Sequence, residues 1–213
     1  ICVTGAGGSI GSELCRQILQ LDPKLLILLD NSEPSLYKIE QDLQAVLPDA
    51  VQLVTILGNA SNEALVKHLF EQHGVELVFH TAAYKHVPLV EANPLAGLAN
   101  NIDSTRVICR AAFESGAKEM VLISTDKAVR PTNVMGASKR LAELVVQAYA
   151  LEAKTLQAAN IERPFTRFSM VRFGNVLGSS GSVVPLFRQQ IESGGPITLT
   201  HPKIIRYFMT IPE

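Results

Sequence analysis

The length, composition and charge of the chain describe an ordinary globular protein. Its 213 residues, of which 47% are hydrophobic and 18% charged, can fill one large core or one domain with part of a second. The formal net charge is −1 and no dense Lys/Arg block occurs in the sequence, so the chain has no electrostatic footprint for nucleic acid. We therefore expect no nucleic-acid partner.

Apolar, β-branched runs alternate with amphipathic segments along most of the chain. Between the runs, apolar residues recur at helical spacing, as in Ile10, Leu14 and Ile18. Gly74 and Gly116 follow such segments and precede runs, as glycines at helix ends do. The alternation predicts an α/β fold, a doubly wound parallel sheet with helices on both faces. The runs occupy residues 1–3, 25–29, 51–57, 75–79, 120–123 and 170–173.

The pattern changes from about Gly174 onward, where Gly, Ser and Pro gather at residues 178–181 and 194–196. We predict a dinucleotide-binding domain over residues 1–174 and the beginning of a substrate-binding portion over residues 175–213. Ile1 opens the chain without a methionine inside an expected strand, and residues 211–213 end it just after a new segment has begun. We therefore expect a fragment whose substrate-binding portion is truncated. No apolar run reaches the roughly 18 residues that span a bilayer, and no signal peptide opens the chain.

The cysteines and histidines predict no metal or redox site. Cys2, Cys15 and Cys109 match no CxxC pattern, and we expect buried thiols in a reducing compartment. His80 and His86 have no third ligand beside them, so we assign no metal.

A glycine-rich loop at residues 4–11 lies between the first run and the first amphipathic segment. There, backbone amides and a helix N-terminus can hold a pyrophosphate. The spacing of Gly5, Gly8 and Gly11 resembles the short-chain dehydrogenase/reductase superfamily more than other Rossmann enzymes. Asp30 lies 19 residues after Gly11 (30 − 11), where a carboxylate takes the ribose hydroxyls of the cofactor.

Asp30 is followed by Asn31 and Ser32, with no basic residue to bind a 2′-phosphate, so we predict NAD rather than NADP. Two more segments fit the superfamily: 80–83 and the asparagine-containing 101–105. Residues 58–61 depart from it, since relatives often have an aspartate there beside the adenine. The predicted cofactor-binding residues are Gly5, Gly8, Ser9, Ile10, Gly11, Asp30, Asn31, Asn59, Ala60, Ala82, Ala83, Asn101 and Lys139.

Met135 stands where these enzymes keep their tyrosine, four residues before Lys139. A thioether has no proton to exchange, so the protein is inactive or its acid and base lie elsewhere. Asp126 and Lys127, which follow the fifth run, are at the end of the sheet where ligands bind. Such a pair is often only a solvated turn or a surface ion pair.

Four motifs together resemble one enzyme family. They are residues 84–88, 125–127, 172–178 and 206–210, which begin with Tyr84, Thr125, Arg172 and Arg206. In this order they resemble the UDP-N-acetylglucosamine 4,6-dehydratases of polysaccharide and glycan biosynthesis, and Met135 resembles their configuration-retaining branch. The resemblance covers essentially all 213 residues.

The resemblance implies a dehydration with NAD as cofactor. Hydride leaves sugar C4, the C5 proton is removed, water is eliminated across C5 and C6, and hydride returns to C6. Lys127 is then the base at C5, Asp126 the acid for the C6 hydroxyl, and Thr125 a hydrogen-bond partner near the C4 hydroxyl. We expect burial against cofactor and sugar to shift the pKa values of Asp126 and Lys127 in the directions these roles need.

The remaining assignments also follow from the resemblance. Lys139 contacts the nicotinamide ribose, and Met135 shapes the pocket as a spacer. Lys85, Asn175 and Arg206 bind the UDP-sugar substrate. We expect a cytoplasmic homo-oligomer, anchored in its full-length form to the cytoplasmic face of the inner membrane. Two alternatives stay open: a nucleotide-sugar epimerase, and a non-catalytic dinucleotide sensor.

Overall fold

The computed structural model describes residues 1–159, 165–179, 183–199, 201–203 and 205–213. The central strands are β1 (Cys2–Thr4), β2 (Leu25–Asp30), β3 (Gln52–Leu57), β4 (Leu77–His80), β5 (Glu119–Thr125) and β6 (Arg167–Phe173). The helices between them are α1 (Ser9–Leu19), α2 (Glu33–Gln44), α3 (Glu63–His73), α4 (Val87–Ala92), α5 (Pro94–Leu98), the π-helical η1 (Ala99–Asp103), α6 (Ser104–Ser115), the 3₁₀ turn η2 (Asp126–Ala128) and α7 (Val134–Ala158). After the sheet come β7 (Asn175–Val176), α8 (Val183–Glu192) and β8 (Phe208–Met209).

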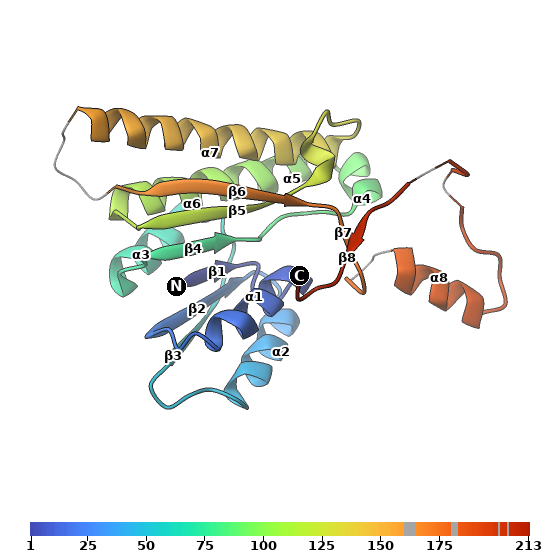
Figure 1. The fold of residues 1–213 in the computed structure, drawn as a ribbon, viewed down its shortest axis with the longest axis horizontal. Helices are drawn as coiled ribbons and strands as arrows, with labels where there is room; N and C mark the ends of the chain where they lie inside the picture. The colour runs from blue at the N-terminus through green and yellow to red at the C-terminus, as the bar shows by residue number, and fades with distance from the viewer. Residues whose placement is uncertain (160–164, 180–182, 200, 204) are drawn as a thin grey trace.

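The six central strands form one parallel sheet in the order β3-β2-β1-β4-β5-β6 (Figure 1). This is a Rossmann-type order, and it confirms the predicted doubly wound α/β fold. Each predicted strand is present with its boundaries shifted by at most three residues. Strand order reverses between β1 and β4, so the crevice beyond their carboxyl ends is where such folds bind ligands.

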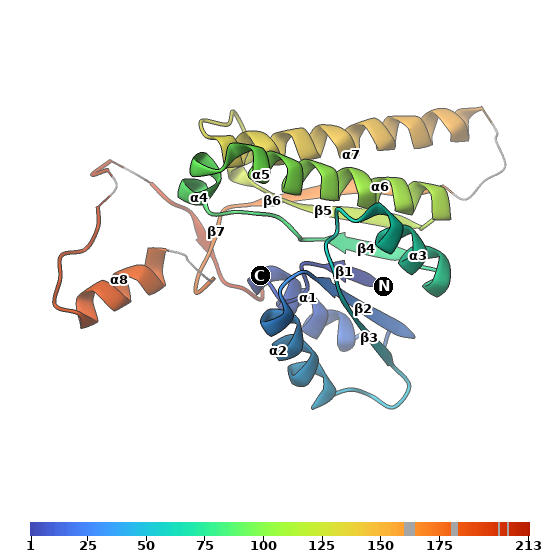
Figure 2. The ribbon, with the colours of Figure 1, turned by 180° about the vertical axis from the view of Figure 1, so that it is seen from behind.

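Successive residues of β2 point to opposite faces of the sheet and build two cores. Leu26 and Leu28 belong to the core under α1 and α2, whereas Ile27 and Leu29 belong to the core under α3 and α6. Figures 1 and 2 show these helix groups from opposite sides of the molecule. Because both faces are covered, the strands read as nearly continuous apolar runs.

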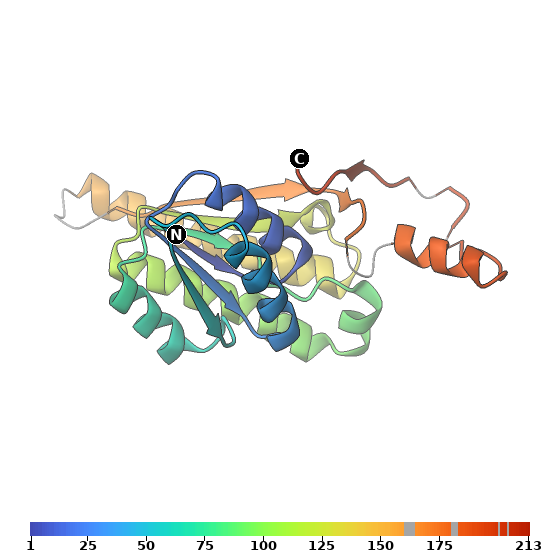
Figure 3. The same cartoon turned by 90° about the horizontal axis from the view of Figure 1, so that it is seen from below.

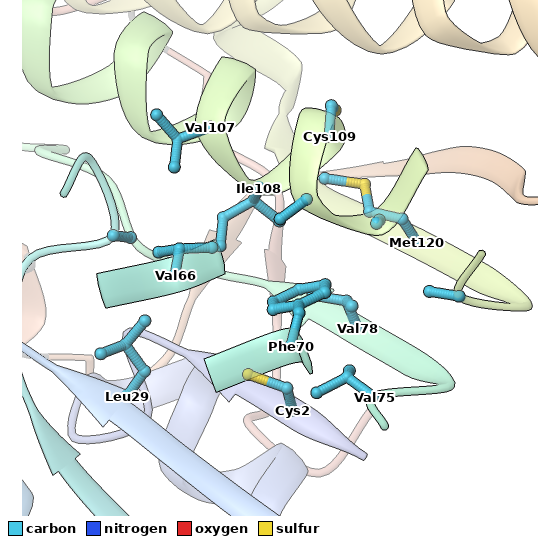
Figure 4. Packing of buried hydrophobic residues seen from close by; sticks show 14 of the residues in the cluster. Cys2, Leu29, Val66, Phe70, Val75, Val78, Val107, Ile108, Cys109 and Met120 are labelled. Carbon is cyan, nitrogen blue, oxygen red and sulfur yellow. The ribbon is translucent and has the colours of Figure 1, made fainter. Parts of the chain in front are cut away.

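The core under α3 and α6 contains side chains from these helices and from the sheet (Figure 4). Cys2 and Cys109 lie in this core, and Cys15 lies in the other, so all three thiols are buried. The predicted helix ends are also present: Gly74 closes α3 with φ of 55° and Gly116 closes α6 with φ of 72°, a left-handed backbone that glycine adopts without strain.

The chain after residue 174 leaves the sheet. β7 pairs with β8 in a separate two-stranded sheet beyond the carboxyl ends of the main strands, and α8 projects away from them (Figure 3). Residues 180–182, which include part of the Gly/Ser stretch noted in the sequence, lie outside the described residues. The terminal residues return to the first helix, where Gln17 Nε2 donates to the carbonyl of Pro212 at 3.1 Å. Among helices in the described ranges, none has the length and apolar character needed to cross a membrane.

Candidate active site

A cavity of about 670 Å³ opens where the strand order reverses, beyond the carboxyl ends of β1, β2 and β4. Its walls include nearly all the predicted cofactor-binding residues and the predicted substrate residue Lys85. The predicted residues that line it are Gly5, Gly8, Ser9, Ile10, Gly11, Asp30, Asn31, Asn59, Ala60, Ala82, Ala83 and Lys85. The cavity therefore joins the glycine loop to the segment that follows β4.

The glycine loop is shaped by close backbone contacts. Gly5 has φ of +66°, and a Cβ at Gly11 would collide with the carbonyl oxygen of Gly5. The N-cap of α1 is Gly8, which has no side chain to accept hydrogen bonds from the first turn of that helix. The helix therefore presents its N-terminal end to the cavity without a capping side chain, as a pyrophosphate site requires.

Asp30 fixes the junction of this loop with the end of β2. Its Oδ2 accepts a hydrogen bond from the main-chain N–H of Gly7 at 2.8 Å, and its Oδ1 accepts one from that of Ser32 at 2.8 Å. The side chain is nearly buried but lines the cavity. A carboxylate has acceptor capacity beyond these two bonds, so a ribose hydroxyl can be bound in the same place.

Asn101 lies behind the cavity rather than in its wall, where its neighbour Asn100 is found. It is 1% exposed and holds the main chain of Tyr84 at two points: its Oδ1 accepts from the Tyr84 N–H at 2.7 Å, and its Nδ2 donates to the Tyr84 carbonyl at 3.0 Å. The same Nδ2 lies 2.8 Å from Ser138 Oγ of α7. In this structure Asn101 therefore supports the segment before Lys85 from behind.

The turn after β5 brings together Thr125, Asp126 and Lys127, three of the five predicted catalytic residues, which also include Met135 and Lys139. Thr125 Oγ1 donates to Asp126 Oδ1 at 3.0 Å, and Lys127 Nζ lies 3.1 Å from the same oxygen. Lys127 Nζ also donates to Asn175 Oδ1 at 3.2 Å. The side chains of Lys127 and Asp126 are 34% and 46% exposed, so both remain accessible to a ligand.

The backbone of this turn is held tightly, unlike that of a solvated surface turn. A Cβ at Gly136 in α7 would collide with the carbonyl oxygen of Lys127, so α7 approaches η2 as closely as glycine allows. On the other side, a Cβ at Gly174 would lie 3.6 Å from Asp126 Oδ2 and 3.0 Å from the carbonyl oxygen of Tyr207. The turn thus has its position set by α7 and by the chain entering β7.

Met135 and Lys139 both lie on α7, which has begun by Val134, and both are buried. Two side chains fix the start of the helix: Glu91 accepts from the Val134 N–H at 2.6 Å, and Asn133 accepts from the Gly136 N–H at 2.8 Å. Lys139 Nζ donates to the carbonyl of Ile123 in β5 at 2.8 Å. Burial lowers the pKa of Lys139 to about 8, against the opposing effect of the nearby Glu143 carboxylate.

The predicted substrate residues do not meet in one place. Lys85 is exposed at the cavity wall, and its partial desolvation lowers its pKa. Asn175 donates through Nδ2 to the carbonyl of Tyr207 at 3.2 Å, besides accepting from Lys127. Arg206 is exposed and forms no ion pair within the described ranges. The cavity wall includes none of Thr125, Asp126, Lys127, Met135, Lys139, Asn175 and Arg206.

Two buried polar groups near the site were not assigned a role from the sequence. His80 is fully buried, with Nδ1 2.7 Å from Thr4 Oγ1 and Nε2 3.2 Å from Thr105 Oγ1, and desolvation lowers its pKa to about 3. Glu143 is fully buried beside the end of β5. Its position between the buried Ala142 and the apolar Val146, one turn after Lys139, is the signal that marks it in the sequence.

Comparison with known proteins identifies the family. The family model described as "Polysaccharide biosynthesis protein" matches residues 1–213. The chain is 48% identical over 213 residues to the capsular polysaccharide biosynthesis protein CapD of Staphylococcus aureus. It is 46% identical over 213 residues to the probable polysaccharide biosynthesis protein EpsC of Bacillus subtilis. All of this chain is covered in both cases, but it spans only 34% of the length of either relative.

Among solved structures, the fold is similar to that of Pen from Bacillus thuringiensis. The TM-score is 0.86 with 31% sequence identity, over 99% of this chain and 62% of that protein. This likeness extends through the β7–β8 region as well as the central sheet, because nearly the whole chain is superimposed. With the family match over residues 1–213, these findings show that the chain belongs to the polysaccharide biosynthesis protein family, within the extended short-chain dehydrogenase/reductase superfamily.

Proposed function

We propose that this chain is the catalytic portion of an NAD-dependent nucleotide-sugar 4,6-dehydratase that acts on UDP-N-acetylglucosamine. The observation that carries the proposal is the turn after β5. There, a single carboxylate oxygen, Asp126 Oδ1, lies within hydrogen-bond distance of Thr125 Oγ1 and Lys127 Nζ. Elimination of water needs both a base at C5 and an acid for the departing C6 hydroxyl, which hydride transfer at C4 alone does not need.

Three independent features of the cavity support the binding of a dinucleotide. The backbone of the glycine loop leaves no room for a Cβ at Gly11, the N-terminus of α1 is uncapped by a side chain, and Asp30 faces the cavity. Gly5, Gly8, Gly11 and Asp30 would hold the pyrophosphate and the adenosine ribose. When bound, NAD supplies a hydride acceptor that later returns the hydride to the product.

The chain's own residues supply the proton transfers. Lys127 removes the C5 proton once C4 is a ketone, because the carbonyl makes that proton acidic. Asp126 donates a proton to the departing C6 hydroxyl, which leaves as water, and Thr125 orients the sugar at the C4 hydroxyl. Asp126 takes the C4 hydroxyl proton as hydride leaves C4, and this is the proton it later gives to the departing C6 hydroxyl. Lys127, whose Nζ lies 3.1 Å from Asp126 Oδ1, acts as the neutral amine and gives a proton back to C5 when hydride returns to C6.

The properties of Met135 agree with proton transfers by Asp126 and Lys127 alone. Its side chain is 3% exposed and packed at the start of α7, where it fills space but exchanges no proton. The C4 hydroxyl proton must then go to a group on the η2 turn, and Asp126 is the available acceptor there. We further propose that the full-length protein is a membrane-anchored homo-oligomer on the cytoplasmic face.

Turnover in heavy water tests the reaction class. The full-length protein is incubated with UDP-N-acetylglucosamine in D₂O, and the product is examined by proton and carbon NMR. We expect a new C6 methyl signal with deuterium at C5, because Lys127 exchanges its proton with solvent before C5 is reprotonated.

Other products point elsewhere. Inversion at C4 without a methyl signal identifies a nucleotide-sugar epimerase and overturns the proposal. Tight NAD binding without turnover of UDP-N-acetylglucosamine or related UDP-hexoses identifies a dinucleotide sensor, the reading that a missing tyrosine first suggests.

A further inference from the structure

Glu143 is a completely buried carboxylate in α7, and its hydrogen bonds come from one hydroxyl and two guanidinium groups. Oε1 accepts from Ser124 Oγ at 2.6 Å and from Arg172 Nε at 2.7 Å. Oε2 accepts from Arg172 Nη2 at 2.6 Å and from Arg140 Nη1 at 3.0 Å. Its exposed fraction is 0%. Four short bonds satisfy both oxygens, as a buried charge requires.

These partners lie directly behind the candidate catalytic turn. Ser124 is the residue before Thr125, and Arg172 is its register partner on the neighbouring strand β6. One helical turn before Glu143, Lys139 Nζ bonds the carbonyl of Ile123, the residue before Ser124. α7 thus bonds two consecutive residues at the end of β5: the Lys139 ammonium bonds Ile123, and the Glu143 carboxylate bonds Ser124.

The charges in this cluster act on each other. Burial alone would raise the pKa of Glu143, but hydrogen bonds from Arg172, Ser124 and Arg140 outweigh it and hold that pKa at about 2. Glu143 is therefore an anion at any physiological pH. Its negative charge favours the protonated ammonium of Lys139 and so raises the pKa of Lys139, although burial, the larger effect, lowers that pKa. The other ionisable groups around this end of α7 are Glu91, Asp126, Lys127, Arg140, Arg172 and the neutral His80.

We propose that Glu143 is a positioning residue of the active site, whose carboxylate holds the end of β5, and with it the Thr125–Lys127 turn, in register with Lys139. Buried ion clusters stabilise a fold little more than apolar side chains of the same volume. A purely structural role therefore does not explain why the charged cluster lies at this end of β5. The kinetic consequence rests on the proposed dehydratase function, whereas the effect on Lys139 does not.

The decisive variant is Glu143→Gln in the full-length protein, which keeps the shape and removes the charge. The matched control is Glu119→Gln: Glu119 bonds Arg167 at 2.8 Å on the same two strands, but at their opposite ends. The titration of Lys139 is followed by NMR of ¹³C-labelled lysine, with its signal assigned from Lys139→Arg. NAD content and the kcat and KM for UDP-N-acetylglucosamine are measured on the same samples across pH.

We expect Glu143→Gln to lower the Lys139 midpoint by about one pH unit or more, as loss of a nearby opposite charge does. We expect kcat to fall about 10- to 100-fold with KM changed less than about threefold, since the reacting groups and not the sugar contacts are displaced. Glu119→Gln should leave the Lys139 midpoint and both kinetic constants at wild-type values. Wild-type titration and kcat in folded Glu143→Gln overturn the inference.

Ser124→Ala keeps the inference testable should Glu143→Gln fail to fold. It removes only the bond between Glu143 and β5 and leaves every charge in place. We expect kcat to fall several-fold with the Lys139 midpoint unchanged, and an unchanged kcat contradicts a positioning role. If the wild-type protein does not dehydrate UDP-N-acetylglucosamine, the proposed function fails. The titration in Glu143→Gln, or in the equally uncharged Glu143→Met if the glutamine variant is unstable, then decides the inference alone.

Discussion

Lys127 Nζ lies 3.2 Å from Asn175 Oδ1, so a hydrogen bond joins the turn after β5 to the first residue of β7. The two residues are 48 positions apart in the sequence. The bond places the candidate base at the boundary between the dinucleotide-binding sheet and the chain that follows it. A ligand that reaches Lys127 therefore touches both parts of the molecule.

Replacing Lys127 by Met should abolish the dehydration without affecting the cofactor. We expect turnover of UDP-N-acetylglucosamine to fall about 10²- to 10⁴-fold, the usual contribution of a general base, with deuterium incorporation at C5 lost. NAD affinity should not change, because Lys127 does not line the cavity. The control is Lys118→Met, which breaks the surface pair with Glu76, 2.7 Å long, and should leave turnover intact. Retained turnover in Lys127→Met excludes Lys127 as the base.

Replacing Met135 by Leu tests whether it is only a spacer. The two side chains have nearly the same volume, and such swaps in a core cost under about 1.5 kcal/mol. We expect turnover within about threefold of the wild type, measured at saturating substrate. The control for the cost in stability is Met120→Leu, since Met120 is also buried but lies in the core under α3 and α6. A loss of turnover beyond 100-fold in Met135→Leu alone shows that the thioether has a chemical role.

Replacing Asp30 by Asn should weaken NAD binding. The substitution removes a charged acceptor from a site where Gly7 and Ser32 N–H groups converge. Hydrogen bonds to charged groups contribute about 1.5–3 kcal/mol, which corresponds to a loss of about 10- to 100-fold in affinity. Calorimetric titration with NAD measures it. Asp49→Asn, in an exposed turn before β3, should bind NAD normally. Equal affinity in the two variants contradicts a role for Asp30 in ribose binding.

The three buried thiols make the fold sensitive to alkali. Burial raises the pKa of Cys2 and Cys15 to about 12, and it also raises that of Cys109. Above pH of about 9 the unfolded chain releases these protons while the folded chain keeps them, so the free energy of unfolding falls as pH rises from 9 towards 12. The slope is about 1.4 kcal/mol per pH unit for each thiol.

Lys139 opposes this effect in part. Its pKa is lowered to about 8 in the folded protein, so its contribution makes the folded state more stable as pH rises from 8 to its ordinary value near 10.5. Urea unfolding at pH 8, 9, 10 and 11 measures the sum. Cys15→Ala should lower stability at pH 8 and reduce the slope above pH 9, and thiol labelling should proceed only through unfolding. A free energy of unfolding independent of pH in this range contradicts the prediction.

Local patterns in the sequence are sufficient to predict the parallel sheet and the glycine-rich loop. The continuous apolar run of β2, the left-handed glycines at positions 74 and 116, and the spacing from Gly11 to Asp30 each depend on a short stretch of chain. Glu143 was not found in this way because its role depends on three elements meeting. The i,i+3 spacing of Arg140 and Glu143 is visible in the sequence, but no spacing shows that Ser124 of β5 and Arg172 of β6 converge on the same carboxylate.

The Asp126–Lys127 pair could be predicted only in part from the sequence. The motif located it at the end of β5, but exposures of 46% and 34% are what a surface ion pair also shows. The feature that distinguishes it is the close approach of Gly136 and Gly174 to the turn, which is a property of packing and not of the motif. The third partner, Asn175, was assigned to the substrate, and the structure places it on Lys127.

Asn101 grips both the N–H and the carbonyl of Tyr84 while also bonding Ser138 on α7. These bonds connect the segment before Lys85 to α7, the helix that carries Met135 and Lys139. Movement of either one away from the sheet would break hydrogen bonds of Asn101. Amide hydrogen exchange at Tyr84 should consequently be as slow as at the centre of α7.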